Sequence, residues 1–356
     1  MLKQKSVWLI VSFVIVSLLL AACGSSNTSS GSGDDVTEAT LTLKFAHEEN
    51  DGDVQDLYAK KFKELIEEKS DGKIQVDIFT AGTLGTNMDV LQSLQTGAIE
   101  LAITSPGFSG DIIPESQIMA IPFLFSDDLE VNRKVLNESE ALYGLLAEKY
   151  EEKGIKPFKF WLEGFMWWTS NKPLTTPNEM KGFKMRTMPT SLIIKSYEYM
   201  GANPTPTDSG EIYTMLQTKG IDGQENPLFY IYNSHFHEVQ DYLIESKHHI
   251  YTTVTAANQD FFDSLNEEEQ QLIAEVIEEV NDWSFDMQEE EAQKALAEIK
   301  NVDIEIIELT SEQREAFKEL SLPVREQFVN DVGEDAQKIL EILEADIEQA
   351  EQELGN

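Results

Sequence analysis

Strand and helix periodicity alternate along the first stretch of the chain that can form a folded body. Alternating apolar residues predict strands, and apolar residues three and four apart predict helices. This alternation favours an α/β fold with a parallel sheet, in which ligand-binding loops follow the carboxyl ends of the strands. Phe108 comes just after the third predicted strand, at such an end. The predicted segments are strand 41–46, helix 53–69, strand 73–79, helix 88–96 closed by Gly97, and strand 99–104.

A second unit of the same kind occurs later in the chain. Residues 94–100 read Leu-Gln-Thr-Gly-Ala-Ile-Glu, and residues 216–222 read Leu-Gln-Thr-Lys-Gly-Ile-Asp, so each predicts a helix end, a glycine and a strand. Two lobes built on one unit would explain this similarity, and a chance match of short motifs is the alternative. The body that begins near Thr40 is also long for a single hydrophobic core. Residues 266–300 and 335–354 predict long amphipathic helices that act as scaffold.

The N-terminus has the pattern of a secretory signal. Basic residues precede an apolar run over 7–20, and small residues stand just before Cys23. The run is short for a membrane span, and the segment resembles a bacterial lipobox. We expect residues 1–22 to be a signal peptide, Cys23 to be lipidated, and 23–39 to be a flexible tether. A buried cysteine in an anchor helix is the alternative; with one cysteine in the chain, no disulfide can form.

Composition and motifs exclude several classes of function. The chain has 65 acidic and 27 basic residues and a net charge of −38, which would repel nucleic acid and anionic lipid. It has no glycine-rich phosphate or dinucleotide loop, no Gly-x-Ser-x-Gly elbow and no His-Glu-x-x-His motif. We therefore expect no enzyme activity and no cofactor. His235, His237, His248 and His249 lie close in sequence, but we expect surface or core histidines rather than a metal site.

Arg186 is the residue that most clearly indicates a ligand. It stands in an apolar, strand-like segment, 183–189, with few other bases nearby. The planar guanidinium matches a carboxylate through two parallel hydrogen bonds. The alternative is that Arg186 pairs with one of the many acidic residues of the chain.

Several segments around Arg186 resemble one family. The Asp-Gly-Gln-Glu-Asn-Pro block within 221–227 is the most specific of them, and the others are 184–189, 201–206, 211–213 and 216–218. From residue 41 onward the chain is similar to the solute-binding proteins of tripartite ATP-independent periplasmic (TRAP) transporters. The resemblance implies that Arg186 clamps a carboxylate and that Asn226 contacts the same group through its amide.

The resemblance also implies a fold and a partner. The expected fold is a two-lobe α/β clamshell, like a type II periplasmic binding protein, with a long helix spanning both lobes. Lobe I is expected at 40–163 plus 252–290, and lobe II at 164–251 plus 291–356. The expected partner is a permease with a small and a large membrane subunit, driven by an ion gradient without ATP. We expect a monomer that faces outside the cytoplasm and touches the membrane only through its lipid.

Within this family, four further segments are most similar to the branch that binds ectoines: 46–49, 52–55, 105–110 and 258–261. Ectoines carry a carboxylate and a delocalised cation. By this resemblance Glu49 would pair with the cation, and Phe108, Phe229 and Tyr230 would offer aromatic faces to it. A solvated acid and ordinary core packing are the respective alternatives.

Two departures from the family pattern bear on the ligand. Met166 stands where members that bind sialic acids and several organic acids carry a second arginine, which argues against a polyanionic ligand. Ser209 stands where pocket aromatics are common, so one wall of an aromatic cage is missing. Other functions remain open: a binding protein for another organic acid or sugar acid, for an ATP-driven importer lacking the 224–227 block, or a secreted enzyme or signalling receptor for the same solute.

Overall fold

The computed structural model describes residues 40–355. The expected signal peptide, Cys23 and tether lie outside this part of the chain. No helix among the described residues is long and apolar enough to cross a membrane.

The first lobe is built on the strands expected from the sequence. β1 (Leu41–Ala46) pairs in parallel with β2 (Ile74–Phe79) and with β3 (Leu101–Thr104). α1 (Val54–Lys69) and α2 (Asn87–Gln95) connect them; α1 buries an apolar stripe, and α2 begins at a capping box formed by Thr86 and Asp89. The sheet then departs from the parallel expectation, because β9 (Ile250–Asn258) runs antiparallel to β3 and to β4 (Ile155–Ser170).

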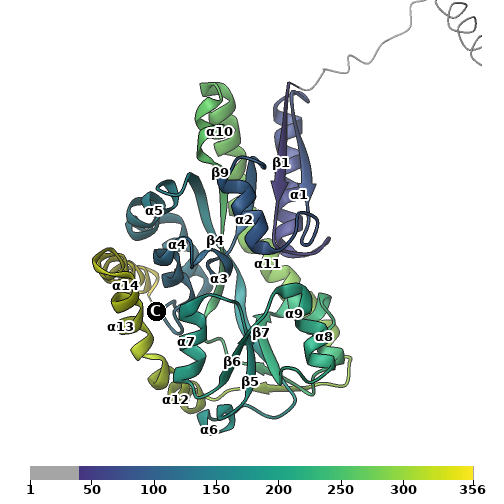
Figure 1. The fold of residues 1–356 in the computed structure, drawn as a ribbon, viewed down its shortest axis with the longest axis vertical. Coiled ribbons are helices and arrows are strands. Elements are labelled where there is room, and N and C mark those ends of the chain that lie inside the picture. Colours follow the sequence, from purple (N-terminus) through teal and green to yellow (C-terminus); the bar gives the residue numbers. More distant parts are fainter. Residues whose placement is uncertain (1–39, 356) are drawn as a thin grey trace, which may run out of the picture. The chain divides into compact units, whose positions relative to one another are not determined.

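β4 links the two lobes. Its first part, up to Phe165, pairs with β9, and its last part, from Met166, pairs with β7 (Gly223–Pro227) and β8 (Tyr242–Glu245). β5 (Lys184–Thr187) lies parallel to β7 and to β6 (Asn203–Pro206), and β10 (Glu305–Glu308) pairs with β8. The strand order is β2-β1-β3-β9-β4-β7-β5-β6. In Figure 1 the first lobe is above and the second below.

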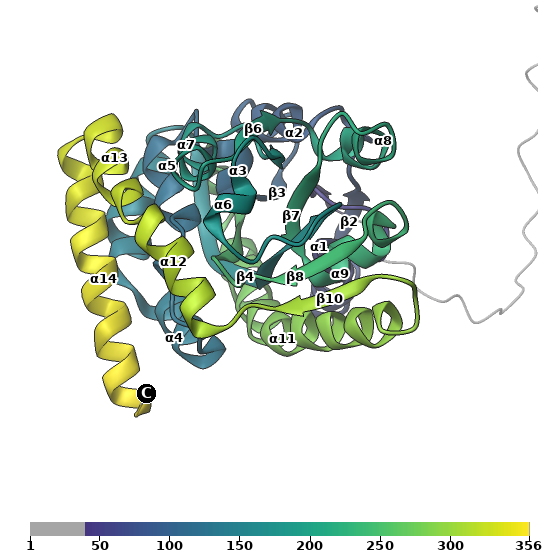
Figure 2. The same ribbon diagram turned by 90° about the horizontal axis from the view of Figure 1, so that it is seen from below.

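Helices cover both lobes. The long helix α11 (Glu267–Ile299) packs against α1 and β4 and also against α9 (Leu228–Asn233), so it contacts both lobes (Figure 2). α14 (Glu334–Leu354) packs against α4 (Leu129–Glu138) and η3 (Ala141–Leu146). The lobe boundaries stay a prediction. The remaining helices are α3 (Pro106–Ser109), η2 (Pro114–Ala120), α5 (Ala147–Glu151), α6 (Pro177–Met180), α7 (Ser191–Tyr199), η4 (Ser209–Glu211), α8 (Ile212–Gln217), η5 (Phe236–Glu238), α10 (Gln259–Ser264), α12 (Ser311–Ser321) and α13 (Pro323–Val332).

The two similar units end their helices differently. After α2 the left-handed residue is Gly97, with φ of 72°, as a glycine cap requires. After α8 it is Lys219, with φ of 59°, and Gly220 follows it. The second unit therefore places a residue with a side chain in a conformation that glycine adopts without strain.

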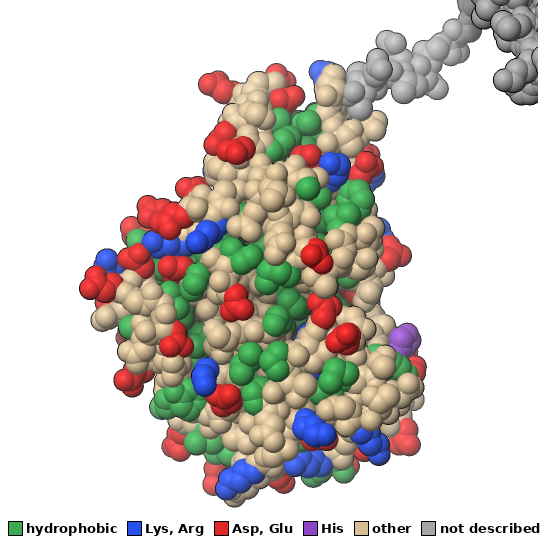
Figure 3. Space-filling model, viewed as in Figure 1, with side chains coloured by type: hydrophobic (Ala, Val, Ile, Leu, Met, Phe, Trp, Pro, Cys, Tyr) green, Lys and Arg blue, Asp and Glu red, His purple; other side chains and the backbone are tan. Residues whose placement is uncertain are grey.

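The core consists of two groups of buried apolar side chains. The larger includes the aromatic stack of Tyr58 on Trp161, and the smaller surrounds Trp168 and is rich in methionine. Acidic side chains are spread across the face seen in Figure 3 rather than gathered in one patch. This distribution fits solvation of the surface by the excess of acidic residues.

Candidate functional site

A small cavity lies where loops of the two lobes meet. It has an empty volume of about 290 Å³, including its opening. β1 and β3 of the first lobe, and β5 and β7 of the second, deliver residues to it from their carboxyl ends. The lining residues are Glu48, Glu49, Asn87, Phe108, Arg186, Met188, Ser209, Asn226, Tyr230 and Tyr251.

Arg186 reaches this cavity without an acidic partner. Its neighbour Met185 points into the methionine-rich core, so strand alternation places Arg186 on the opposite face of β5. Its Nε and Nη2 donate to the carbonyl oxygen of Thr207 at 3.0 and 2.8 Å. The side chain is only 2 % exposed, and no carboxylate oxygen among residues 40–355 lies within 4.0 Å of the guanidinium. Burial lowers the pKa of Arg186 from its ordinary value.

Arg186 and Asn226 therefore form a polar pair on neighbouring strands. β7 alternates as β5 does, so Gln224 and Asn226 share one face and Glu225 lies on the other. The Asn226 amide donates to the side-chain oxygen of Gln224, and both residues are buried. A buried cation with donors to spare is costly unless an anion pairs with it. This side of the cavity is suited to a carboxylate.

Buried carboxyl groups form the opposite side. Glu48 and Glu49 follow β1, and Glu163 lies on β4 behind them. Gln55 joins all three: its side-chain oxygen accepts from the Glu48 N–H at 2.8 Å, its N–H donates to Glu49 at 2.9 Å, and its amide donates to Glu163 at 2.9 Å. The carboxyls of Glu49 and Glu163 are close enough to influence each other's pKa.

These carboxyl groups have no basic partner. Within the part of the chain described, no Lys, Arg or His nitrogen lies within 4.0 Å of any of the three. Burial raises the pKa of Glu48 to about 8 and that of Glu163 to about 7, and it also raises the pKa of Glu49 well above its ordinary value. Burial therefore disfavours the charged form of each carboxyl, and a cation in the cavity would favour it.

Apolar and aromatic side chains close the remaining walls. Phe108 lies in α3 and Tyr230 in α9, and both line the cavity. Phe229 does not line it: the side chain is 1 % exposed and belongs to the larger core group, next to the Tyr230 ring. Met166 is also buried in the core, whereas Ser209 lines the cavity.

The two lobes touch each other beside the cavity. A Cβ atom on Gly107 would lie 2.0 Å from the Met188 sulfur, so a larger residue there would require the Met188 side chain to move. The Thr190 hydroxyl donates to the carbonyl oxygen of Pro106 at 3.0 Å, and the Asn87 amide lies 3.5 Å from the Ser209 hydroxyl. These contacts lie beside the space that separates Arg186 from Glu48, Glu49 and Glu163, which together form the carboxyl cluster.

Sequence reasoning did not identify Glu48, Glu163, Met188 or Tyr251. A charged residue within an apolar strand, as Glu163 is within β4, was the available signal. Gln55, which donates a hydrogen bond to Glu163, lies 108 residues away in the sequence. The hydrogen bonds that join the three glutamates could therefore not be predicted from local sequence.

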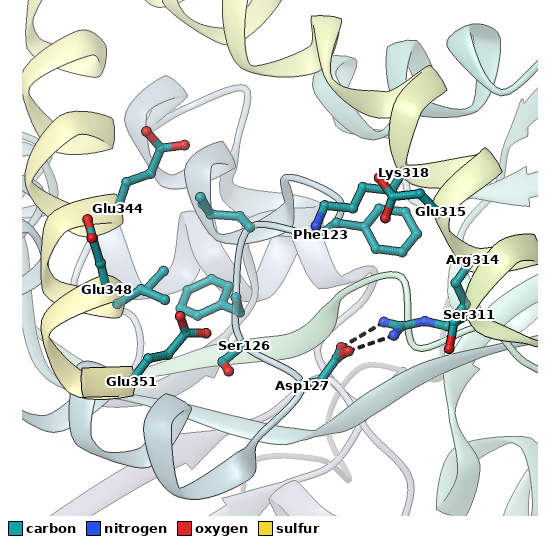
Figure 4. Close-up of a pocket in the computed structure, with 13 residues that line it drawn as sticks. Phe123, Ser126, Asp127, Ser311, Arg314, Glu315, Lys318, Glu344, Glu348 and Glu351 are labelled. Atoms are coloured by element: carbon teal, nitrogen blue, oxygen red, sulfur yellow. Dashed lines mark hydrogen bonds and ion pairs between the residues drawn. The ribbon is translucent and has the colours of Figure 1, made fainter. Parts of the chain in front are cut away.

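A larger surface pocket of about 1040 Å³ lies between α12, α14 and residues 123–127. Arg314 lines this pocket, and its guanidinium donates two hydrogen bonds of 2.6 and 2.7 Å to Asp127 (Figure 4). Arg314 is thus already paired, unlike Arg186. The pocket offers mixed charges and no comparable set of unpaired groups.

A buried polar cluster lies on the other face of β7. The Glu225 carboxylate is 2.5 Å from the Tyr197 hydroxyl, 2.6 Å from His248 Nε2 and 3.3 Å from His249 Nε2. Burial alone would raise the pKa of Glu225, but hydrogen bonds with both histidines hold it well below its usual range. Burial lowers the pKa of His248 to about 4. The cluster fixes β7 behind Asn226.

A two-lobe α/β fold with oppositely charged, unpaired groups facing one enclosed cavity defines a protein that binds a small solute. The chain belongs to the bacterial extracellular solute-binding protein family 7, whose model matches residues 45–331, and it is a solute-binding protein of the TRAP type. The two-lobe α/β fold expected from the sequence is confirmed.

Named relatives share most of their length with this chain. The ectoine-binding periplasmic protein TeaA of Halomonas elongata is 37 % identical over 312 residues, covering 87 % of this chain and 91 % of TeaA. The ectoine/5-hydroxyectoine-binding periplasmic protein UehA of Ruegeria pomeroyi is 37 % identical over 308 residues, covering 86 % and 90 %. The structure of the Halomonas elongata protein matches with a TM-score of 0.84 at 36 % identity, covering 86 % of this chain and 99 % of that one.

Proposed function

We propose that this protein captures a small zwitterion of the ectoine type and delivers it to a TRAP permease. The observation that carries the proposal is one cavity with an unpaired guanidinium on one side and unpaired carboxyl groups on the other. Arg186 and Asn226 hold the solute's carboxylate, and Glu49 pairs with its delocalised cation. Phe108 and Tyr230 pack against the cationic ring.

Charge balance favours a zwitterion over an anion. A simple carboxylate would satisfy Arg186 but would leave the Glu49 side without a counter-charge. A dicarboxylate would bring a second negative charge towards Glu48, Glu49 and Glu163, which already repel one another. A second arginine at position 166 would compensate such a charge. This chain has Met166 there, and the Met166 side chain lies in the core.

The lining of the cavity supports the same ligand class, because residues of both lobes contribute to it: Glu49 and Phe108 from the first, Arg186 and Asn226 from the second. The proposed mechanism is closure of the lobes around the solute, driven by its contacts with both.

The proposal also includes the membrane anchor, the oligomeric state and the partners of the protein. Cys23 carries the lipid that holds the protein outside the cell membrane, the protein is a monomer, and it performs no catalysis. Its partners are the small and the large membrane subunits of the permease. The two lobes divide as the sequence predicts except at α14, which packs against α4 and η3 of the first lobe. Cys23→Ser should release the protein from the membrane fraction; retention there would contradict lipid anchoring.

Isothermal titration calorimetry with three probes tests the ligand. The probes are ectoine, a monocarboxylate of similar size without a cation, and an amidinium without a carboxylate. We expect ectoine to bind much more tightly than either. Equal binding of the monocarboxylate would refute the zwitterion assignment, because the carboxyl cluster would then contribute nothing.

Substitution tests the two ends of the site. Arg186→Gln leaves the carboxylate half paired and should cost about 2–5 kcal/mol of binding free energy, and Glu49→Gln should weaken ectoine but not the monocarboxylate. Arg314→Gln is the matched control, since it removes a guanidinium outside the cavity. Unchanged ectoine affinity in Arg186→Gln would refute the clamp.

A further inference from the structure

The turn after α9 brings two histidines and a glutamate to one point. His235 has a left-handed backbone with φ of 59° and immediately precedes η5. The turn directs His235, His237 and Glu238 to the same side, where His235 Nδ1 lies 3.2 Å from a Glu238 carboxylate oxygen. One ring nitrogen from each histidine and one carboxylate oxygen all lie within 4.8 Å of one another.

This spacing suits a tetrahedral metal ion. Zinc bonds to histidine nitrogen and carboxylate oxygen are about 2.0–2.1 Å, which places two ligands of a tetrahedron about 3.3 Å apart. The distance between His235 and Glu238 already meets that value, and small rotations of exposed side chains would bring the third ligand in. Imidazole and carboxylate are donors that Zn²⁺ accepts.

His237 is the ligand that is already held in place. Its ring stacks on Tyr232, with centroids 5.1 Å apart and planes 15° apart. The residue is 8 % exposed, yet Nδ1 has no hydrogen-bond partner within residues 40–355. An unpaired buried nitrogen is costly, and a metal ion would satisfy it while the stacking on Tyr232 orients the ring.

The surroundings favour a cation. The three residues line a surface hollow of about 1070 Å³ that also contains Asp53 and Glu298, together with Asp51, which is paired with Lys60 at 2.7 Å; no lysine or arginine is among its described lining residues. Asp53 accepts a hydrogen bond of 2.6 Å from Asn233, which fixes the loop after β1 beside the turn. The hollow leaves room for water to complete the coordination.

The other histidine cluster lacks this feature. His248 bonds Ser246 and Glu225 through its two ring nitrogens, and His249 bonds the Ile250 carbonyl and Glu225. Each ring nitrogen there already has a partner, whereas His237 Nδ1 has none.

We propose that His235, His237 and Glu238 form a surface site for a divalent transition-metal ion of the Zn²⁺ class. The site lies next to the solute cavity but is separate from it, so it does not depend on the proposed solute. From the sequence alone, surface or core histidines were expected here, because none of the four neighbouring histidines comes with a pattern of residues suited to orienting it as a metal ligand.

Titration of the purified, chelator-treated protein without a histidine tag with Zn²⁺ tests the site. We expect saturable binding of one ion, and at least about tenfold weaker binding in His235→Gln and in His237→Gln. His235 is exposed, so its substitution tests the site even where His237→Gln alters local packing. Glu198→Gln is the matched control, because it removes an exposed helical carboxylate from an i,i+3 pair with Lys195.

Co²⁺ gives a second measurement, since its visible spectrum reports tetrahedral coordination. The absence of saturable binding would overturn the proposal. Equal affinity in wild type and both histidine variants would also overturn it, as would loss of binding in His248→Gln alone, which would place the ion at the buried cluster.

Discussion

Glu48→Gln should make the ligand-free protein less sensitive to alkaline pH. Glu48 is buried, one of its oxygens accepts from the Ser105 N–H at 3.1 Å, and the other has no hydrogen-bond partner among the described residues. Its pKa rises from 4.5 in the unfolded chain to about 8 in the fold. A raised carboxyl pKa contributes stability that is present below pH 4.5 and is lost as pH rises towards 8.

The size of the effect follows from the shift. Each pH unit between the two pKa values costs about 1.4 kcal/mol, so the wild type should lose about 4 kcal/mol through Glu48 between pH 5 and pH 8. Glutamine has a similar shape and does not ionise, so the variant should avoid this loss. Its free energy of unfolding should therefore exceed that of the wild type at pH 8 and differ little at pH 5.

Urea unfolding of both proteins at pH 5 and pH 8, without ligand, measures this difference. Glu198→Gln serves as the control, since that exposed carboxyl should produce no pH-dependent gain. If Glu48→Gln shifts stability equally at both pH values, Glu48 does not carry a raised pKa, and the carboxyl cluster is hydrated or paired.

Two further substitutions test local conformation. Lys219→Gly should raise the free energy of unfolding by about 0.5–1 kcal/mol, because it places glycine at φ of 59°; thermal unfolding measures this, and a loss of stability would contradict it. Gly107→Ala should weaken ectoine binding, because the Met188 side chain, which lines the cavity, would have to move away from the new methyl group; titration calorimetry would show this. Gly107→Ala combined with Met188→Ala should recover part of that affinity, and a failure to recover would show that the clash is not the cause.

Local sequence patterns predicted much of the architecture. The spacing of apolar residues predicted the ends of β1, α1, β2, α2 and β3 to within about two residues. This was possible because strand and helix periodicity are properties of neighbouring residues. The mixed direction of the sheet was not predictable in this way, since β9 joins β3 from about 150 residues away and direction depends on that long-range pairing.

The residues of the candidate site were also only partly predictable from local sequence. Arg186, Asn226, Glu49, Phe108 and Tyr230 were named from the chain and line one cavity. Phe229 was named beside Tyr230 and lies in the core. Successive residues of a helix point about 100° apart, so a sequence motif cannot tell which of two neighbouring aromatics faces a ligand.

Features that depend on neighbouring residues could therefore be predicted from the sequence. They are the guanidinium in an apolar strand, which is suited to a carboxylate, and the family, which is marked by the Asp-Gly-Gln-Glu-Asn-Pro block. Folding added what depends on distant residues. Among residues 40–355 it left no carboxylate oxygen within 4.0 Å of the Arg186 guanidinium, joined Glu48, Glu49 and Glu163 through Gln55, and turned His235 towards His237. The physical reason is that pairing, burial and the pKa values they set are properties of a three-dimensional environment, in which groups more than a hundred residues apart become nearest neighbours.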